Sequence, residues 1–400
     1  MTVNNEMRND TKNEMNNDTK NEMRNNIKNE MRNDTKNEMR NDTKNEMRND
    51  TKNEMRNDTK NEMRNNVHEA KYYTIIAAEV VRCELCPRYC TLSVGKTGFC
   101  GARKNVAGKL FSLNYGRVSS LALDPIEKKP LRRFMPGAMI LSCGSFGCNL
   151  ACDFCQNHSI AQDTPYTVYI SPEEMVAKAL ELKASDERSG DERSEGSGDG
   201  RSGDDRSGDD RSGDDRGGDV GSGDVGSGIY SGGSIGLAYT YNEPSIWFEY
   251  VYDCAVLAKS KGLINVLVTN GLINEKPLEE ILPLVSAMNI DLKGTGEFYR
   301  TLCGASAGYA DIIKANIIRA SQRCHVEVTM LVVPGWNDDI SIIESTADWL
   351  ASVPNEIPLH LSRYFPNNRM RNSLPTSREF MMKAADVARR RLKYVYTGNM

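Results

Sequence analysis

Short apolar runs alternate with amphipathic stretches along much of the chain. The apolar runs, which predict buried strands, are residues 138–144, 234–240, 264–270, 287–293, 325–334 and 357–364. Between them lie stretches with the helical spacing of apolar positions, such as 171–183 and 245–262. The first of these begins with Ser171 and Pro172, a cap residue and a first-turn proline that favour a helix start.

This alternation predicts repeated βα units. Because right-handed crossovers make successive strands parallel, about six such units predict an α/β fold built on a partial or full parallel βα barrel. In folds of this kind the chemistry lies in the loops that follow the carboxyl ends of the strands. We therefore look for functional residues directly after the apolar runs.

One segment without this alternation is an eight-residue repeat, NEMRNDTK with small variations, over residues 5–66. Each repeat has a single Met, from Met7 to Met63. Eight residues turn a helix by about 800°, so successive Met side chains are rotated by about 80° and form no apolar seam. Asn and Asp also have low helix propensity. We therefore predict that residues 1–68 are a disordered arm.

A second such segment, residues 185–228, holds 14 acidic and 6 basic residues, and Gly and Ser make up most of the rest. This composition predicts a flexible, disordered acidic linker. With both segments set aside, we predict a small Cys-rich module over 69–134 and the βα barrel over 135–400, interrupted by the linker. The linker follows a helix and precedes a strand, so we expect it opposite the face that carries the chemistry.

Charge and hydropathy exclude several classes of protein. The net charge is -4 and the pI is near 5.8, which argues against a nucleic-acid-binding protein. No run of about 18 apolar residues predicts a membrane span, and the polar N-terminus lacks the apolar core of a secretory signal. We expect a cytoplasmic protein. Its eleven cysteines are then expected to be metal ligands or buried thiols rather than disulfides.

The stretch GCNLACDFCQN, residues 147–157, holds Cys148, Cys152 and Cys155 in the spacing C-x3-C-x2-C, directly after an expected strand. This arrangement resembles the radical S-adenosylmethionine (SAM) superfamily. The resemblance implies that the three thiolates hold three irons of a [4Fe–4S] cluster and that SAM occupies the fourth iron. It also implies reductive cleavage of SAM to a 5′-deoxyadenosyl radical, which takes hydrogen from a substrate. A zinc site completed by a fourth ligand such as His158 is the alternative.

A closer resemblance covers about residues 83–398. Its motifs are CELCPRYC, GKTGFCGAR, DPIEKKPLRRF, GCNLACDFCQN, TYNEP, VTNG, IDLKG and LHLSRYFP. They are similar to the radical SAM enzymes related to the pyruvate formate-lyase activating enzyme, above all to the branch found with AMMECR1-type and Memo-type proteins, the AmmeMemoRadiSam system. The chain departs from that branch at Arg133, where the branch usually has His, and in lacking a further cysteine pair after the YVYTGN motif.

The resemblance also implies contacts with SAM at the expected strand ends. The superfamily's usual Gly-Gly-Glu contact with the SAM amino group is absent in that form, and Glu243 of TYNEP is the candidate for this role. Lys293 of DLK suits the SAM carboxylate, and Asp291 suits a ribose hydroxyl or a bound cation. The alternative for Glu243 is a carboxylate held in a structural hydrogen bond.

Three further residues complete the predicted cofactor site. Asn270 and Gly271 of VTNG fit a close approach of the backbone to the cofactor. His360, in the last expected strand, either contacts the ribose or adenine of SAM or is a histidine of the core. The sequence leaves that choice open.

A second set of cysteines lies upstream, within 18 residues of one another: Cys83, Cys86, Cys90 and Cys100. Four thiolates can close a tetrahedral zinc site, and the same four can hold a second [4Fe–4S] cluster that relays electrons. The sequence does not separate the two metals.

Three functions follow from these patterns. The first is a radical SAM enzyme that acts on an unidentified substrate, with a reductant such as a ferredoxin or flavodoxin and with AMMECR1-type and Memo-type proteins as partners. The second is an activating enzyme that makes a glycyl radical on a partner protein. The third is a non-catalytic iron–sulfur or zinc scaffold. Neither a membrane nor a nucleic acid is expected as a partner.

Overall fold

The computed structural model describes residues 68–191 and 232–400, without the side chains of 185–191. The octad repeats over 5–66 and residues 192–228 of the predicted acidic linker lie outside the described residues. The described residues form one compact unit.

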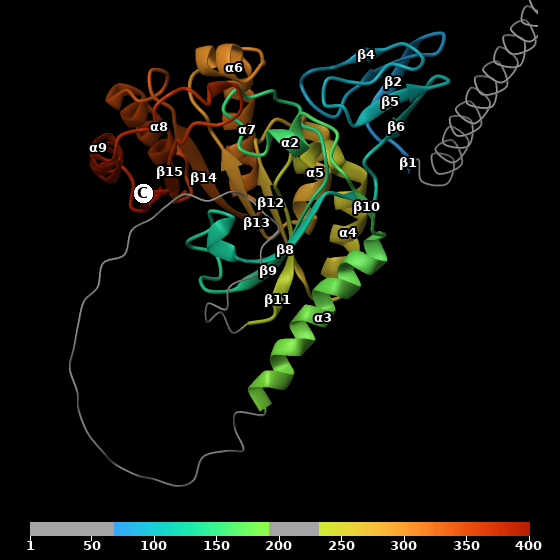
Figure 1. Ribbon diagram of the computed structural model, residues 1–400, viewed down its shortest axis with the longest axis horizontal. Helices are drawn as coiled ribbons and strands as arrows, with labels where there is room; N and C mark the ends of the chain where they lie inside the picture. Colours follow the sequence, from blue (N-terminus) through green and yellow to red (C-terminus); the bar gives the residue numbers. More distant parts are fainter. Residues whose placement is uncertain (1–67, 192–231) are drawn as a thin grey trace, which may run out of the picture. The chain divides into compact units, whose positions relative to one another are not determined.

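An eight-stranded sheet forms the core of this unit, in the order β16-β15-β14-β13-β12-β11-β9-β8 (Figure 1). The strands are β8 (Ser120–Pro125), β9 (Met139–Gly144), β11 (Ser234–Tyr239), β12 (Ile264–Thr269), β13 (Ala287–Asp291), β14 (His325–Val332), β15 (Leu359–Arg363) and β16 (Val395–Gly398). All pairings are parallel except that of β8 with β9. Parallel strands are buried on both faces, and every residue of β9 is buried. The six predicted apolar runs are therefore strands, and the structure adds β8 and β16.

The sheet is curved but open. Its edges are β8 and β16, and among the described strands no pairing joins them. The fully closed barrel, one of the two predicted forms, is therefore not made. The α/β class and a mostly parallel sheet are confirmed.

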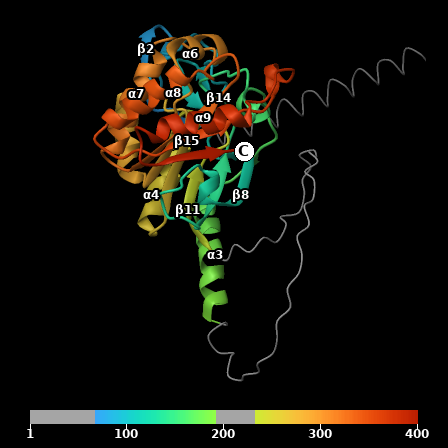
Figure 2. The ribbon, with the colours of Figure 1, turned by 90° about the vertical axis from the view of Figure 1, so that its left-hand side faces the viewer.

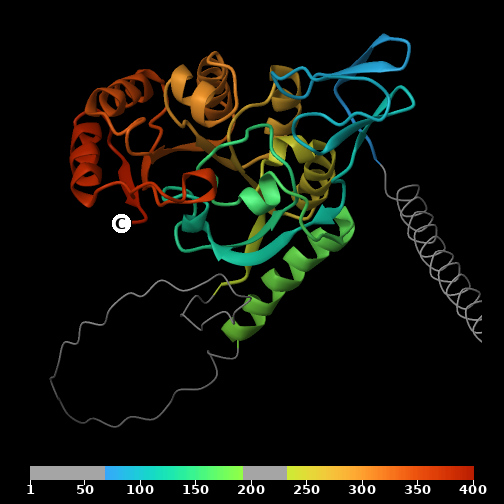
Figure 3. The same ribbon diagram turned by 45° about the horizontal axis from the view of Figure 1, so that its top comes forward.

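Helices cover the outer face of the curved sheet, while α2 and the cysteine loop before it lie inside the curve (Figure 3). The helices are α2 (His158–Ala161), α3 (Pro172–Asp191), α4 (Phe248–Ser260), α5 (Glu275–Ile281), α6 (Gly296–Leu302), α7 (Tyr309–Ser321), α8 (Ile340–Ser352) and α9 (Arg378–Arg389). Short 3-10 turns occupy Ile126–Lys128, Pro244–Trp247, Leu282–Leu284 and Asn368–Met370. None of the described helices is long and apolar enough to cross a membrane.

Helix α3 begins as predicted and ends later than predicted. Ser171 Oγ accepts a hydrogen bond from Glu174 N (3.2 Å), and Glu174 Oε2 accepts one from Ser171 N (2.8 Å), which is a capping box. The helix then continues to Asp191, seven residues into the segment 185–228 that was predicted to be linker. Propagating a helix costs far less than starting one, so composition alone placed this end too early. Figure 2 shows α3 projecting beyond the sheet.

The Cys-rich N-terminal part forms two small antiparallel sheets, β1-β6-β5 and β2-β3-β4. Their strands are β1 (His68–Glu69), β2 (Tyr73–Ala77), β3 (Val80–Cys83), β4 (Thr91–Leu92), β5 (Arg103–Val106) and β6 (Lys109–Ser112), and a further pair joins β7 (Arg117–Val118) to β10 (Val168–Tyr169). The predicted module boundary at residue 134 is too late, because β8 already belongs to the main sheet. Its half-exposed pattern gave no buried apolar run to find.

Candidate functional site

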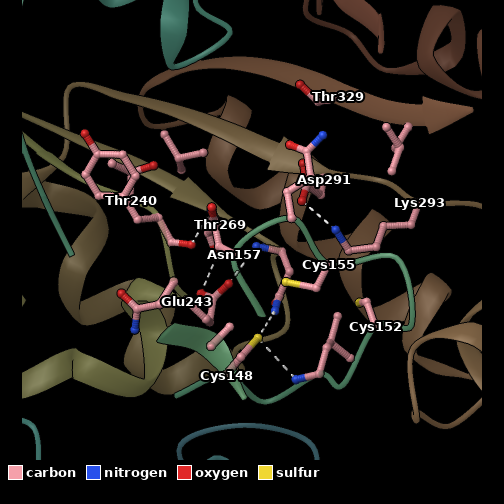
Figure 4. Close-up of a pocket in the computed structure, with 18 of the residues that line it drawn as sticks. Cys148, Cys152, Cys155, Asn157, Thr240, Glu243, Thr269, Asp291, Lys293 and Thr329 are labelled. Atoms are coloured by element: carbon pink, nitrogen blue, oxygen red, sulfur yellow. Dashed lines mark hydrogen bonds and ion pairs between the residues drawn. The ribbon is translucent and has the colours of Figure 1, made fainter. Parts of the chain in front are cut away.

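A cavity of about 280 Å³ opens at the carboxyl ends of the parallel strands. Its walls come from the loop after β9 and from the ends of β11, β12, β13, β14 and β15. Seven of the predicted site residues line it: Cys148, Cys152, Cys155, Glu243, Asn270, Asp291 and Lys293. Figure 4 shows the cysteine loop facing Glu243, Asp291 and Lys293 across this space.

The loop after β9 is held in place by its neighbours. Gly147 has φ +85°, and a Cβ there would lie 2.3 Å from the carbonyl oxygen of Cys100, so only glycine fits. Asn242 fixes the loop from the other side. Its Oδ1 accepts from Ser145 N (2.8 Å) and its Nδ2 donates to Gly147 O (3.1 Å). Cys148 therefore follows a tightly fixed turn.

Burial affects the pKa of all three thiols. Burial raises the pKa of Cys148 well above its ordinary value, and the nearby Glu243 adds to this. A hydrogen bond with Cys303, together with burial, does the same for the pKa of Cys152. Burial raises the pKa of Cys155 to about 11. A metal bound here has to displace these protons.

A single-ion site is not formed at the loop. Within the described ranges, no three His, Cys, Asp or Glu side chains are grouped so that they could hold one metal ion. His158, the fourth ligand of the zinc alternative, lies on α2 with its Nδ1 3.8 Å from Asp163 Oδ2, and it does not line the cavity. That alternative therefore loses the ligand on which it depended.

Glu243 is 3% exposed and follows β11 at the cavity wall. Its Oε1 accepts from Ser245 N (2.9 Å) and Thr269 Oγ1 (2.6 Å), and its Oε2 accepts from Asn270 N (2.8 Å). Burial raises the pKa of this carboxyl, against the hydrogen bonds that lower it. A carboxylate has about four acceptor positions, so one remains for a donor in the cavity.

Lys293 and Asp291 form an ion pair at the end of β13, with Nζ 2.5 Å from Oδ2. Burial alone would lower the pKa of Lys293, but the negative charge of Asp291 raises it well above its ordinary value. The ammonium is therefore retained beside the cysteine loop. Its remaining N–H groups can meet a ligand carboxylate.

Gly271 and His360 are not in the cavity lining. Gly271 has φ +71°, and a Cβ there would lie 2.7 Å from Ile290 Cγ2, so the residue is required by packing. His360 Nε2 is 2.5 Å from Glu327 Oε2, and its ring stacks on Tyr396. This surrounding matches the core-histidine alternative for His360.

Several polar residues of the cavity were not predicted: Asn157, Thr240, Asn242, Thr269, Thr329 and Ser362. Thr329 lies in the β14 run and Ser362 in the β15 run. The signal that could have found them is a hydroxyl at an inward-facing position near the carboxyl end of a predicted strand, since inward positions recur every second residue. Asn242 carried a different signal, because it stands within the TYNEP motif beside Glu243.

The upstream cysteines surround a second, much smaller cavity. It measures about 10 Å³ and is lined by Cys83, Cys86, Cys90 and Cys100, together with Arg88, Arg103 and Asn149. Burial raises the pKa of Cys83, and raises those of Cys86 and Cys100 to about 12 and about 11. The fold therefore places the predicted four thiols on the walls of one small space, although, as at the first loop, no three of these described side chains are grouped as a ready single-ion site.

Comparison with known proteins agrees with this geometry. The family model of the radical SAM superfamily matches residues 228–349, a range that contains Glu243, Asp291 and Lys293. An uncharacterized protein of Methanocaldococcus jannaschii is 34% identical over 342 residues, which are 84% of this chain and 86% of the relative.

Two solved structures show weaker likeness. A domain of a pyruvate-formate lyase-activating enzyme from Bacteroides vulgatus has 20% identity and a TM-score of 0.36, covering 41% of this chain and 99% of that one. A radical SAM methyltransferase from Sphaerobacter thermophilus has 14% identity and a TM-score of 0.42, covering 66% and 67%. Likeness at these TM-scores carries no argument about function.

Proposed function

We propose, from the premise that the chain belongs to the radical SAM superfamily, that Cys148, Cys152 and Cys155 hold a [4Fe–4S] cluster and that the adjoining cavity binds SAM. The observation that carries the proposal is the placement of three cysteines from one loop on the wall of a cavity whose other walls are charged strand ends. Three thiolates leave one iron of such a cluster open to a ligand.

The residues of the cavity fit both groups. SAM carries an ammonium and a carboxylate. Glu243 offers a carboxylate with one free acceptor position, and Lys293 offers an ammonium. Hydroxyl groups of Thr240 and Ser362 line other walls and suit a ribose. The volume is near the lower end of the range for ligand sites, about 300 Å³.

When bound, the cluster and SAM together supply one-electron reduction and a carbon-centred radical that removes hydrogen from a substrate. The chain contributes position and exclusion of water. The buried loop holds the thiolates, Glu243 and Lys293 orient the two ends of the amino-acid part, and the apolar walls from Leu150, Phe154 and Leu331 keep water away.

The substrate is proposed to be carried by a protein, in keeping with an activating enzyme. This is favoured by large apolar side chains exposed on loops that leave the same edge of the sheet: Trp336 (41%) after β14, and Phe365 (40%) and Leu374 (78%) after β15. Exposed aromatic and apolar groups around a site are typical of protein contact surfaces.

The finer assignments of the sequence resemblance are also proposals. They are membership of the AmmeMemoRadiSam branch, AMMECR1-type and Memo-type partners, and a ferredoxin or flavodoxin as reductant. The upstream Cys83, Cys86, Cys90 and Cys100 are proposed to hold zinc or a second [4Fe–4S] cluster. Their support is the convergence of four thiols on one small cavity.

The proposal is tested by anaerobic reconstitution of the full chain with iron and sulfide, followed by SAM and a strong reductant. Formation of 5′-deoxyadenosine, measured by chromatography, is expected from the wild type. Cys152→Ala should abolish it, because two thiolates cannot retain the cluster, whereas Cys324→Ala, outside the cavity lining, should not. Undiminished 5′-deoxyadenosine from the Cys152 variant would refute the cluster assignment.

A further inference from the structure

Arg103 carries a feature that the proposed function does not explain. The residue is 1% exposed, and its Nε is one of two buried side-chain nitrogen or oxygen atoms without a hydrogen-bond partner among the described residues, Ser245 Oγ being the other. A buried N–H without an acceptor destabilises a folded protein. An acceptor is therefore expected next to this nitrogen.

Both terminal nitrogens of the Arg103 guanidinium make hydrogen bonds. Its Nη2 donates to both carboxylate oxygens of Glu249 (2.6 and 2.7 Å), and its Nη1 donates to Lys71 O (3.1 Å). Glu249 lies in the first turn of α4, is itself 1% exposed, and also accepts from Lys71 N (2.8 Å). These bonds fix the guanidinium plane, so Nε cannot turn elsewhere for a partner.

The space around Arg103 is the small cavity of the upstream thiols. Arg103 lines it together with Cys83, Cys86, Cys90 and Cys100. Four thiolates bound to Zn²⁺, or to the oxidised core of a [4Fe–4S] cluster, leave a net charge of about -2. Glu249 binds a terminal nitrogen of Arg103, so Nε–H is the unpartnered donor of this side chain beside a space lined by four sulfurs.

A second arginine connects the same loop to the SAM site. Arg88 stands between Cys86 and Cys90, and its Nε donates to Asn149 O (2.5 Å). Asn149 follows Cys148, and the Cys100 carbonyl lies against Gly147 on the other side of that cysteine. The upstream loop therefore contacts both neighbours of Cys148.

We propose that Arg103 donates its Nε–H to a metal-bound thiolate of a tetrathiolate centre at Cys83, Cys86, Cys90 and Cys100, and that it ties this centre to α4 through Glu249. The inference rests on the proposed metal binding by these four cysteines. Arg103 is then a positioning residue. The metal centre holds the upstream loop against Cys148, and Arg103 holds the metal centre against α4, which follows Glu243.

The experiment uses the full chain with Cys148, Cys152 and Cys155 replaced by Ala, so that only the upstream thiols can bind metal. Zinc, iron and sulfide per chain are measured after anaerobic purification and reconstitution, and then the rate of metal release to a chromophoric chelator. About one zinc or about four irons are expected in this parent protein. Either result supports a metal centre, and the measured amounts of zinc, iron and sulfide identify the metal.

Arg103→Met in that background should release the metal about 10- to 100-fold faster, the loss typical when a partner of a metal ligand is removed. Because the change leaves Glu249 buried and unpaired, the variant could fail to fold. The double variant Arg103→Met/Glu249→Leu removes both charges, which proteins often tolerate, and should show the same acceleration. Arg82→Met is the matched control, since Arg82 neighbours Cys83 on β3 but is half-exposed and does not line the cavity.

The outcomes distinguish the role of Arg103 from metal binding by the four upstream cysteines. Metal in the parent with equal release rates in the Arg103 and Arg82 variants would overturn the role of Arg103 and leave the metal centre standing. A parent without metal would overturn the centre and the inference together. Neither result bears on 5′-deoxyadenosine formation, which is measured separately with Cys148, Cys152 and Cys155 intact.

Discussion

Among single residues, Glu243 has the surroundings that bear most directly on the ligand. Three donors from Ser245, Thr269 and Asn270 hold the carboxylate, and the residue lines the cavity. A purely structural carboxylate would have no need to line a cavity beside three cysteines. The arrangement is that of a group fixed in advance to receive a cation or an N–H donor.

Glu243→Gln should therefore weaken SAM binding. Loss of a hydrogen bond to a charged group costs about 1.5–3 kcal/mol, which is about 10- to 100-fold in the dissociation constant. Binding is measured by equilibrium dialysis with the reconstituted protein, and thermal unfolding checks the fold. Thr269→Val, which removes one support of Glu243 but no carboxylate, serves as the control. Equal SAM affinity in Glu243→Gln and wild type would make Glu243 a structural residue.

At the scale of elements, a comparison of two glycines distinguishes the cost of a left-handed backbone from the cost of a crowded side chain. Gly262 after α4 and Gly271 after β12 both have φ +71°. A Cβ at Gly262 would meet nothing within 4 Å, whereas one at Gly271 would lie 2.7 Å from Ile290 and 3.2 Å from Ile313. The turn at Gly271 is thus closely packed against β13 and α7.

Gly271→Ala should destabilise the protein more than Gly262→Ala. The left-handed backbone costs about 1–2 kcal/mol in both variants, and overpacking adds about 1–3 kcal/mol at Gly271 alone. Urea unfolding monitored by tryptophan fluorescence measures the difference. Equal free energies of unfolding for the two variants would show that the side chains around Ile290 move to accept the added methyl group. Packing would then not explain the glycine at position 271.

The helices and strands also show which parts of the fold a sequence pattern can predict. The six buried strands were predictable because parallel strands with both faces covered are continuous apolar runs. β8 and β16 lie at the edges of the sheet, are partly exposed, and carry no such run. The start of α3 was marked by its capping box, but no residue marks its end within 185–191, so the predicted boundary there was wrong.

At the scale of the whole described unit, Glu327 joins distant parts of the chain. It accepts hydrogen bonds from Arg132 N (3.0 Å) and Arg133 N (2.7 Å), and its carboxylate contacts His325 and His360. Burial alone would raise the pKa of Glu327, but these partners lower it to about 2. One carboxylate thus fastens the segment before β9 to β14 and β15.

This makes stability depend on pH in a defined window. The pKa of Glu327 lies near 4.5 unfolded and about 2 folded. Its ionised form therefore stabilises the fold fully above about pH 5, and the contribution is lost as pH falls toward 2. The whole contribution is about 3 kcal/mol, of which about 2 kcal/mol is lost by about pH 3.

Glu327→Gln should accordingly lose less free energy of unfolding than the wild type between about pH 6 and about pH 3, by about 2 kcal/mol, in urea titrations at each pH. The exposed Glu181→Gln on α3 should follow the wild type. Parallel pH profiles for the wild type and the Glu327 variant would mean that folding does not shift the pKa of this carboxyl.

The same residue shows why part of the site was beyond sequence reasoning. The cysteine loop and the strand-end motifs are local signals, so seven cavity residues could be found from their neighbours in the chain. The role of His360 depends on Glu327, which lies 33 positions away and one strand over. The unpartnered Nε of Arg103 likewise exists only once α4 is packed against β5. Such pairings depend on tertiary contacts, which a local sequence pattern does not predict.

The placement of the join between α3 and β11 has a practical consequence. α3 ends at Asp191, and β11 starts at Ser234 and reaches the cavity only at its opposite, carboxyl end. β11 therefore begins at the end of the sheet remote from the thiols. A fluorescent domain or an affinity handle joined to the chain ahead of Ser234 is expected to leave the cavity undisturbed.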